Sequence, residues 1–247
     1  MNRFLKLLKM EGRLSLRCPD SVFFGIVMPA GIIALIGFIS AGKPAFEGAD
    51  YTLLESSFGA LITVGICATA FMGIPLTLAD YRDKKILKHF FVTPTSPSVL
   101  LLVQGLIQMI FCFVSSLVVF AVVKLFFGYH MRGFLPNFLL AYLLVLVSMY
   151  SLGMLLASLC KNIKIANVAT GAVYFPMFFL SGASIPYEIF PKPLQYVSNI
   201  LPLTQGIKLL KAYSLGLTQE NTVFPVVYLL ALTAVGIALS VKFFRWE

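Results

Sequence analysis

The chain has 247 residues, of which 59% are apolar and only 12% are charged, whereas soluble domains are usually about 25% charged. This composition excludes an ordinary soluble domain and predicts an integral membrane protein whose six spans, at about 20 residues each, leave no room for a separate soluble domain. The net charge of +9 is then explained by the orientation of the protein in the membrane and by contact with anionic lipids, rather than by nucleic-acid binding.

The first 20 residues are expected to form an amphipathic helix in the cytoplasmic membrane interface. Its basic residues recur every three or four positions and share one face: Arg3, Lys6, Lys9, Arg13 and Arg17. Its large apolar residues face away from that stripe: Phe4, Leu5, Leu8 and Leu16. A signal peptide fits less well, because Glu11 interrupts the charged stretch and no small-residue cleavage site follows.

Six stretches can cross a bilayer as helices, because each has at least 19 residues and lacks Asp, Glu, Lys and Arg. They are residues 22–40, 57–79, 99–123, 134–160, 165–183 and 223–241. Prolines within or near these spans are expected to kink them: Pro29, Pro75, Pro136, Pro176 and Pro225. The small-residue spacing of Gly65, Thr69 and Gly73 predicts a close helix contact in the second span, with a helix that it does not identify.

The first span ends in GFISAGKP, residues 37–44, which contains most of a phosphate-binding loop. Such a loop needs a strand before it and a Ser or Thr after its lysine. Here an apolar helix precedes Gly37, and Pro44 follows Lys43. We therefore interpret the stretch as a glycine-rich helix end with a snorkelling lysine, and not as a nucleotide site.

Orientation follows from the distribution of lysine and arginine. With the amino terminus inside, 13 of the 19 basic residues lie on the inner side, in segments 1–21, 80–98, 161–164 and 242–247. Both termini are therefore expected to be cytoplasmic, in a multi-pass protein of a bacterial or archaeal inner membrane.

The inner segment between spans two and three, residues 80–97, reads DYRDKKILKHFFVTPTSP. Its apolar residues fall on one side of a short helix and its lysines on the other. Asp80 is expected to cap the start of this helix, and Thr93-Pro94 to end it. The apolar side could lie on lipid headgroups or in a groove on a partner protein, and periodicity alone favours the headgroups.

No set of residues predicts catalysis. His89 and His130 fall on opposite sides of the membrane, and the four cysteines lack Cys-x-x-Cys spacing. The spans contain no carboxylate or histidine of the kind that ion-coupled transporters use. No metal site is expected, and energy for any uphill transport should enter from outside the bilayer.

The outer segment of residues 184–222 is too apolar for a solvated loop, and five of the 13 prolines lie between 176 and 202. Irregular backbone at membrane depth persists only where protein or water covers it. We expect short helices that dip back into the outer leaflet as a lid. The alternative is an amphipathic hairpin on the surface.

Two stretches resemble type-two ATP-binding-cassette (ABC) exporter permeases. The coupling region of that family runs roughly Glu-Arg-Glu-x-Gly-Thr-Leu, five residues, Thr-Pro and an apolar span. This chain matches it at Arg82, Asp83, Leu87, Thr93 and Pro94, and departs from it at Tyr81, Lys85 and Ile86. The late signature of the family is matched at Pro176, Ser181, Gly182, Pro186, Glu188, Pro191, Leu194, Pro202, Leu203, Thr204, Leu215 and Gly216.

The resemblance implies an all-α membrane protein, a single permease domain over residues 1–247, and roles for three groups of residues. The ATPase-coupling group is Arg82, Asp83, Lys84, Ile86, Leu87, Phe90, Phe91, Thr93 and Pro94. The substrate-path candidates are Phe58, Thr63, Phe71, Asn167, Thr170, Tyr174 and Phe178, although an aromatic stripe can equally reflect lipid or helix packing. The outer-lid candidates are Ser181, Gly182, Pro186, Glu188 and Pro202.

The implied function is the membrane subunit of an ATP-driven exporter that forms its path as a dimer, with a second copy or a homologue. ATP and magnesium would bind to separate cytoplasmic ABC ATPase subunits, and this chain would bind no cofactor. The nearly uncharged bundle suits a lipophilic or amphipathic substrate such as a drug, an antibiotic or a lipid-like molecule. The alternatives are a polysaccharide-exporting permease of the same family, a passive channel or membrane anchor, and an intramembrane enzyme.

Overall fold

The computed structural model describes residues 3–16, 22–40, 42–45, 48–86, 97–183, 187–217 and 222–243. The described residues are helical apart from short connections and one isolated bridge between Pro44 and Thr52. Six helices are long and apolar enough to cross a membrane: Phe23–Ser40, Leu53–Asp83, Leu102–Phe127, Leu135–Leu159, Ile163–Leu180 and Val223–Phe243. The expected all-α fold with six spans is therefore confirmed. The largest difference is in the second span, which extends about one helical turn beyond 57–79 at each end.

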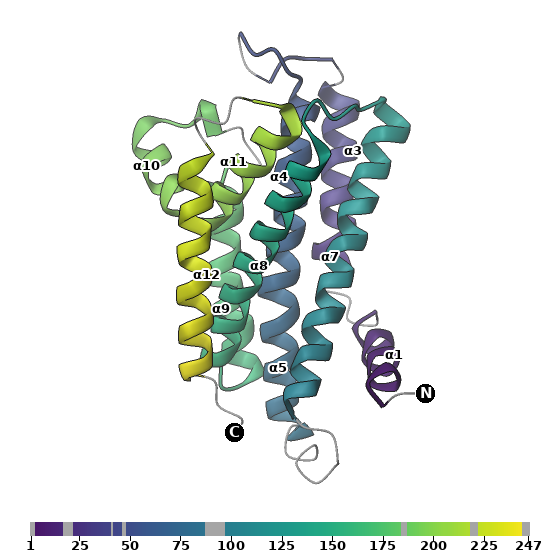
Figure 1. The fold of residues 1–247 in the computed structure, drawn as a ribbon, viewed down its shortest axis with the longest axis vertical. Coiled ribbons are helices and arrows are strands. Elements are labelled where there is room, and N and C mark those ends of the chain that lie inside the picture. Colours follow the sequence, from purple (N-terminus) through teal and green to yellow (C-terminus); the bar gives the residue numbers. More distant parts are fainter. Residues whose placement is uncertain are drawn as a thin grey trace.

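The helices form one elongated bundle (Figure 1). The N-terminal helix α1 (Arg3–Ser15) lies beside the lower end of α7 (Pro97–Phe127). The second span comprises α4 (Leu53–Ala68), η2 (Thr69–Gly73) and α5 (Ile74–Asp83), and α4 is buried along almost its whole length. The lower ends of α5 and α12 (Val223–Phe243) lie at the same end of the bundle as α1.

Two π-helical segments interrupt the first two spans. The first, η1 (Phe23–Val27), precedes α3 (Met28–Ser40), and η2 precedes α5. Each ends two residues before a proline, Pro29 or Pro75. A proline ring clashes with the carbonyl of the preceding turn and lacks an N–H, so a wider turn accommodates it. The expected disturbance at these two prolines therefore takes the form of a π segment.

The glycine spacing in the second span faces α7. A Cβ atom at Gly65 would lie 3.0 Å from Ser115 Oγ, and one at Gly73 would overlap the side chain of Gln108. Both partners belong to α7, so the structure identifies the helix that the sequence left open. On another side of the span, Tyr150 of α8 (Leu135–Leu159) donates a hydrogen bond to Thr69 Oγ1 at 3.1 Å.

The outer segment folds into short helices, as expected. After α9 (Ile163–Leu180), the chain forms η3 (Tyr187–Ile189), α10 (Lys192–Ile200) and α11 (Pro202–Leu215) at the end of the bundle opposite α1 (Figure 1). Helix α11 packs closely on α4, because a Cβ atom at Gly59 would lie 2.9 Å from the Lys211 backbone nitrogen. This helix is therefore part of the protein core, and Leu203, Leu209 and Leu210 are fully buried.

Candidate functional site

The last turn of α5 is attached to the turn that joins α8 to α9. Arg82 Nη1 donates hydrogen bonds to the carbonyl oxygens of Ala157 and Cys160, each at 2.6 Å. Asp83 Oδ2 accepts a hydrogen bond from the Ile163 backbone N–H at 2.9 Å. Two adjacent residues of α5 therefore hold the two sides of one interhelical turn, which we call the α8–α9 turn (residues 157–163).

The charges of this attachment match the helix ends that they contact. The final carbonyls of a helix and the first N–H groups of the next lack partners within their own helices. A cation is stabilising at the former and an anion at the latter. Arg82 meets the end of α8, and Asp83 meets the start of α9. Burial raises the pKa of the Cys160 thiol, and the Arg82 guanidinium opposes this increase.

The expected coupling helix does not begin at Asp80. Helix α5 continues through Asp83, and the carboxylate of Asp80 pairs with Lys84 at 2.7 Å within this helix and the turn that follows. The prediction of an N-cap at Asp80 is therefore wrong, because the second span continues into this segment without a break. The chain turns at Lys84 and Lys85, and Ile86 is the last described residue before the gap. Five coupling candidates lie outside the described residues: Leu87, Phe90, Phe91, Thr93 and Pro94.

A buried carboxyl group lies beside the coupling segment. Glu11 of α1 is only 4% exposed, and it accepts hydrogen bonds from the Tyr81 hydroxyl and, at 2.6 Å, from Gln104 Nε2. Leu7, one turn earlier, packs with Tyr81 in the same small core. In the sequence, Glu11 is visible only as an acidic interruption of the charged stretch. Its position on the helix could have predicted its burial, because residues 4, 7, 8, 11 and 15 share one face.

This docking changes the expected orientation of α1. Phe4 and Leu8 pack against the bundle, whereas Leu5 and Leu16 are exposed. The four apolar residues were predicted to face the same side. In the structure, two of them pack against the bundle and two are exposed. Lys6, Lys9 and Arg13 are exposed, as the basic stripe predicted.

The substrate-path candidates lie mostly inside the bundle of this single chain. Phe58, Thr63, Phe71, Thr170, Tyr174 and Phe178 are buried, and Asn167 is exposed. On α9, the Tyr174 and Phe178 rings stack 6.1 Å apart, and Thr170 donates a hydrogen bond to the carbonyl oxygen of Asn167. Phe58 instead contacts rings outside this set, including Tyr129 at 4.7 Å and Phe138 at 6.0 Å.

The described lid candidates lie where α9 leads into the outer helices. Ser181 is buried and donates a hydrogen bond to the Phe178 carbonyl oxygen, and Gly182 has a φ of 86°, which favours glycine. Pro202 occupies the first turn of α11, where its missing N–H costs nothing. Pro186 lies outside the described residues, as does the side chain of Glu188.

A small cavity of about 130 Å³ lies between α3, α4, η3 and α11. Its walls include Ser56, Ser57, Ser181 and two lysines of α11, Lys208 and Lys211. The Lys208 ammonium lies 3.8 Å from the centre of the Tyr187 ring and donates a hydrogen bond to Asn199 Oδ1. Lys208 is therefore held by contacts within the short helices η3 and α10, whereas the Lys211 ammonium lies 5.0 Å from the centre of the Tyr51 ring, before α4.

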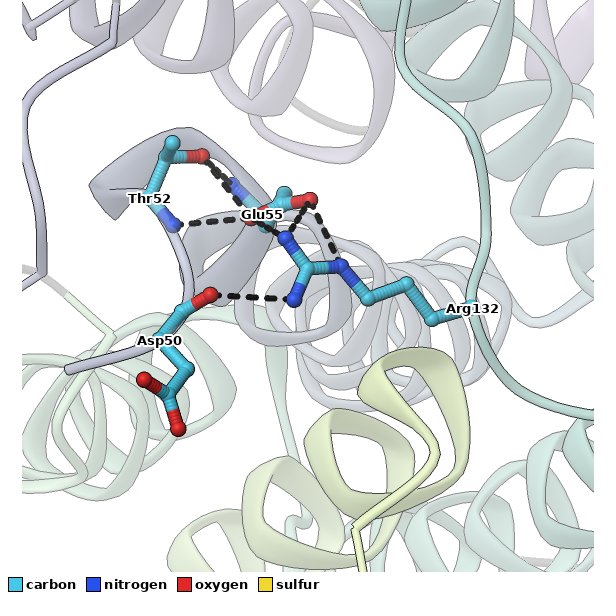
Figure 2. Close-up of polar contacts among 4 residues, drawn as sticks. All are labelled: Asp50, Thr52, Glu55 and Arg132. Atoms are coloured by element: carbon cyan, nitrogen blue, oxygen red, sulfur yellow. Dashed lines mark hydrogen bonds and ion pairs between the residues drawn. The ribbon is translucent and has the colours of Figure 1, made fainter.

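An ion-pair network joins the start of α4 to the connection between α7 and α8 (Figure 2). Thr52 and Glu55 form a capping box at the start of α4. Arg132 donates hydrogen bonds to both Glu55 carboxylate oxygens, at 3.1 and 3.2 Å, and to the Asp50 carbonyl oxygen at 2.9 Å (Figure 2). No sequence pattern predicts this network, because Arg132 and Glu55 are more than 70 residues apart.

The stretch resembling a phosphate loop belongs to the end of a helix. Residues 37–40 are the last turn of α3, and Gly37 packs against the Phe127 ring, where any side chain would overlap it. A helix therefore precedes Gly42 and Lys43, in place of the strand that the motif requires. Within the described ranges, no three His, Cys, Asp or Glu side chains converge as metal ligands would.

Comparisons with known proteins find a family and relatives that match much of this chain. A family model described as ABC-2 type transporter matches residues 2–215. Two curated relatives, each named inner membrane transport permease YhhJ, come from Escherichia coli (strain K12) and Shigella flexneri. Each is 26% identical over 135 residues, and the match covers 53% of this chain but only 35% of the relative.

Proposed function

The chain belongs to the ABC-2 type transporter family, and from this premise we propose that it is the membrane subunit of an ATP-driven exporter. Separate cytoplasmic ABC ATPase subunits bind ATP and magnesium in this proposal, and a second permease copy or a homologue completes the path. The chain itself catalyses no reaction.

The attachment of α5 to the α8–α9 turn is the observation that carries the proposal. Arg82 and Asp83 belong to the segment that resembles the ATPase-coupling region. A force applied to that segment is transmitted along the second span, and through three hydrogen bonds to the ends of α8 and α9. ATP-driven movement of one short segment can thereby move α5 together with the attached ends of α8 and α9.

The substrate in this proposal is lipophilic or amphipathic. The candidate path lies near the second span and α9, whose buried side chains include Phe58, Thr63 and Tyr174. Because most of these side chains are buried in the single chain, substrate passage requires the bundle to open. The mechanical attachment at the cytoplasmic end supplies a means of opening it.

A gentle-detergent purification from native membranes tests the partnership. We expect a soluble ATPase to copurify in stoichiometric amount with the native chain. It should be lost in Phe90→Asp, because this substitution would place an unpaired charge in an apolar groove of the ATPase. Retention of the ATPase and of export by that variant would contradict docking through this face. Purification of the chain alone, without ATP binding, would favour a passive channel or an anchor.

The attachment itself is tested with Arg82→Gln and Asp83→Asn in the reconstituted complex. Each variant weakens hydrogen bonds to a charged group, which contribute about 1.5–3 kcal/mol each. We expect at least a severalfold decrease in substrate moved per ATP hydrolysed, with ATPase binding retained. Lys161→Ala is the matched control, because Lys161 is an exposed cation in the same turn. Equal effects of all three variants would contradict the role of the attachment.

A further inference from the structure

An apolar groove opens on the side of the bundle between α4, α7 and α8. It encloses about 400 Å³, within the range of small-molecule sites. Its floor is formed by buried residues, including Phe58 and Phe138, whereas Phe113, Leu117 and Leu139 at its lips are about half exposed. Phe113 and Leu117 belong to α7, and Phe138 and Leu139 lie near the start of α8, all within the spans.

Of the three hydroxyl groups that line the groove, those of Ser116 and Tyr142 bond to each other, whereas that of Tyr129 is buried and has no hydrogen-bond partner in the described residues. Ser116 Oγ donates a hydrogen bond to the Tyr142 hydroxyl at 3.1 Å, and Cys112 Sγ lies 3.3 Å from the same hydroxyl. Apart from Tyr129 and the residues at the mouth, the lining is apolar or already hydrogen-bonded, so a hydrocarbon chain suits the groove.

The mouth of the groove carries positive charge. Lys124 and His130 lie there, and the Lys124 ammonium is 5.6 Å from the centre of the Phe120 ring. Lys124 forms no ion pair with a carboxylate in the part of the chain that the structure describes.

A second cavity of about 550 Å³ adjoins this mouth and shares Tyr129 and His130 with it. Its carboxylate, Glu55, is bound through both oxygens by Arg132. Lys124, which lines the groove and not the second cavity, is therefore the cation left for a ligand at this mouth.

We propose that the groove binds one acyl chain of an anionic phospholipid, with the phosphate of its headgroup at Lys124 and His130. The lipid solvates the exposed lips, and its charge is complementary to the mouth. This site lies outside the predicted substrate path, except for Phe58 in its floor. The inference concerns a resident lipid of the bilayer and does not rest on export.

Quenching by brominated lipids tests this proposal. The chain has one tryptophan, Trp246, so Trp246→Phe with Leu117→Trp places a single fluorophore at the lip of the groove. Vesicles would contain either phosphatidylglycerol or phosphatidylcholine brominated on the acyl chain, at equal mole fraction. We expect at least twofold stronger quenching by the anionic lipid, and equal quenching by the two lipids after Lys124→Ala. The control Lys192→Ala removes an exposed cation of α10 and should preserve the preference.

A tryptophan outside the groove distinguishes lipid binding at a specific site from general contact with the bilayer. Leu230→Trp on the lipid-length helix α12 should be quenched equally by both lipids, because Leu230 is exposed and lies outside the groove. Phe113→Trp repeats the measurement at the other lip if Leu117→Trp does not fold. Equal quenching by the two lipids at the groove would overturn the proposal. Protection of the groove from both lipids would also overturn it, and would indicate that another protein chain covers this face.

Discussion

Lys85 has a left-handed backbone conformation, with a φ of 56°, and no other non-glycine residue in the described ranges has a positive φ. It follows the last turn of α5, where helices commonly end with a glycine. The family pattern also has glycine at this position. Lys85 therefore departs from the family pattern at a position where the left-handed backbone strains any residue other than glycine.

Lys85→Gly is expected to stabilise the protein by about 1 kcal/mol, because a side chain in the left-handed region costs roughly 1–2 kcal/mol and glycine does not pay this cost. Thermal unfolding in detergent measures the change. Lys84→Gly is the matched control: Lys84 has an ordinary φ of −78°, so its substitution should be mildly destabilising. A loss of stability in both variants would contradict strain at Lys85.

Glu11 is a second residue whose structural role depends on its buried environment. Its carboxyl group is buried against Tyr81 and Gln104, so removing it leaves donors without their acceptor in a desolvated place. Such a loss costs about 1–3 kcal/mol. We infer that Glu11 fastens α1 to the bundle.

Glu11→Ala is expected to release α1 and to raise the rate of tryptic cleavage at its exposed basic residues, Lys6, Lys9 and Arg13, severalfold. Timed digestion followed by mass spectrometry of the N-terminal peptides measures this rate. Met10→Ala alters the exposed side of the same helix and should digest like the native protein. An unchanged rate in Glu11→Ala would mean that the carboxyl group does not hold the helix.

At the scale of elements, the close packing of α8 on the second span depends on Gly153. A Cβ atom there would overlap the carbonyl oxygen of Ala70 in η2. Backbone atoms cannot move aside as the end of a flexible side chain can. The two helices can therefore approach this closely only at a glycine.

Gly153→Ala is expected to destabilise the protein by about 1–3 kcal/mol, the usual cost of overpacking. Gly105→Ala in α7 is the control, because a Cβ atom at Gly105 meets no atom within 4 Å, and alanine is the better helix former. Thermal unfolding of the two variants should move in opposite directions. Equal stability of both would show that α8 can shift away from η2 at little cost.

At the scale of the whole molecule, the structure places α1 and the ends of α5 and α12 together, with α10 and α11 at the opposite end (Figure 1). The basic residues follow the same division, since most of them lie in the segments at the α1 end. The positive-inside rule therefore assigns the α1 end to the cytoplasm. This orientation stays a prediction.

Labelling of single cysteines in intact cells tests the orientation. With the four native cysteines replaced by serine, an impermeant maleimide should label Lys192→Cys in α10 from outside. Lys161→Cys, at the α8–α9 turn, should react only after permeabilisation. Both positions are exposed, so accessibility to solvent does not separate them. The reverse pattern would place the coupling segment outside the cell and contradict the proposed function.

The sequence by itself determined the membrane class, the six spans and the short outer helices. Each depends on local composition: a run of about 20 uncharged apolar residues can satisfy its backbone in lipid only as a helix, wherever its neighbours lie. The family motifs could also be recognised from the sequence, because they depend on the order of residues along the chain.

Only the tertiary structure decided where the polar residues of the site act. Arg82 and Asp83 were marked as coupling residues, but their partners, Ala157, Cys160 and Ile163, lie 75 to 80 residues away. The burial of Glu11 depends on Tyr81 and Gln104, 70 and 93 residues away, and the groove depends on three helices at once. Periodicity shows which residues share a face, but it does not show what that face meets. That contact is set by packing between distant segments.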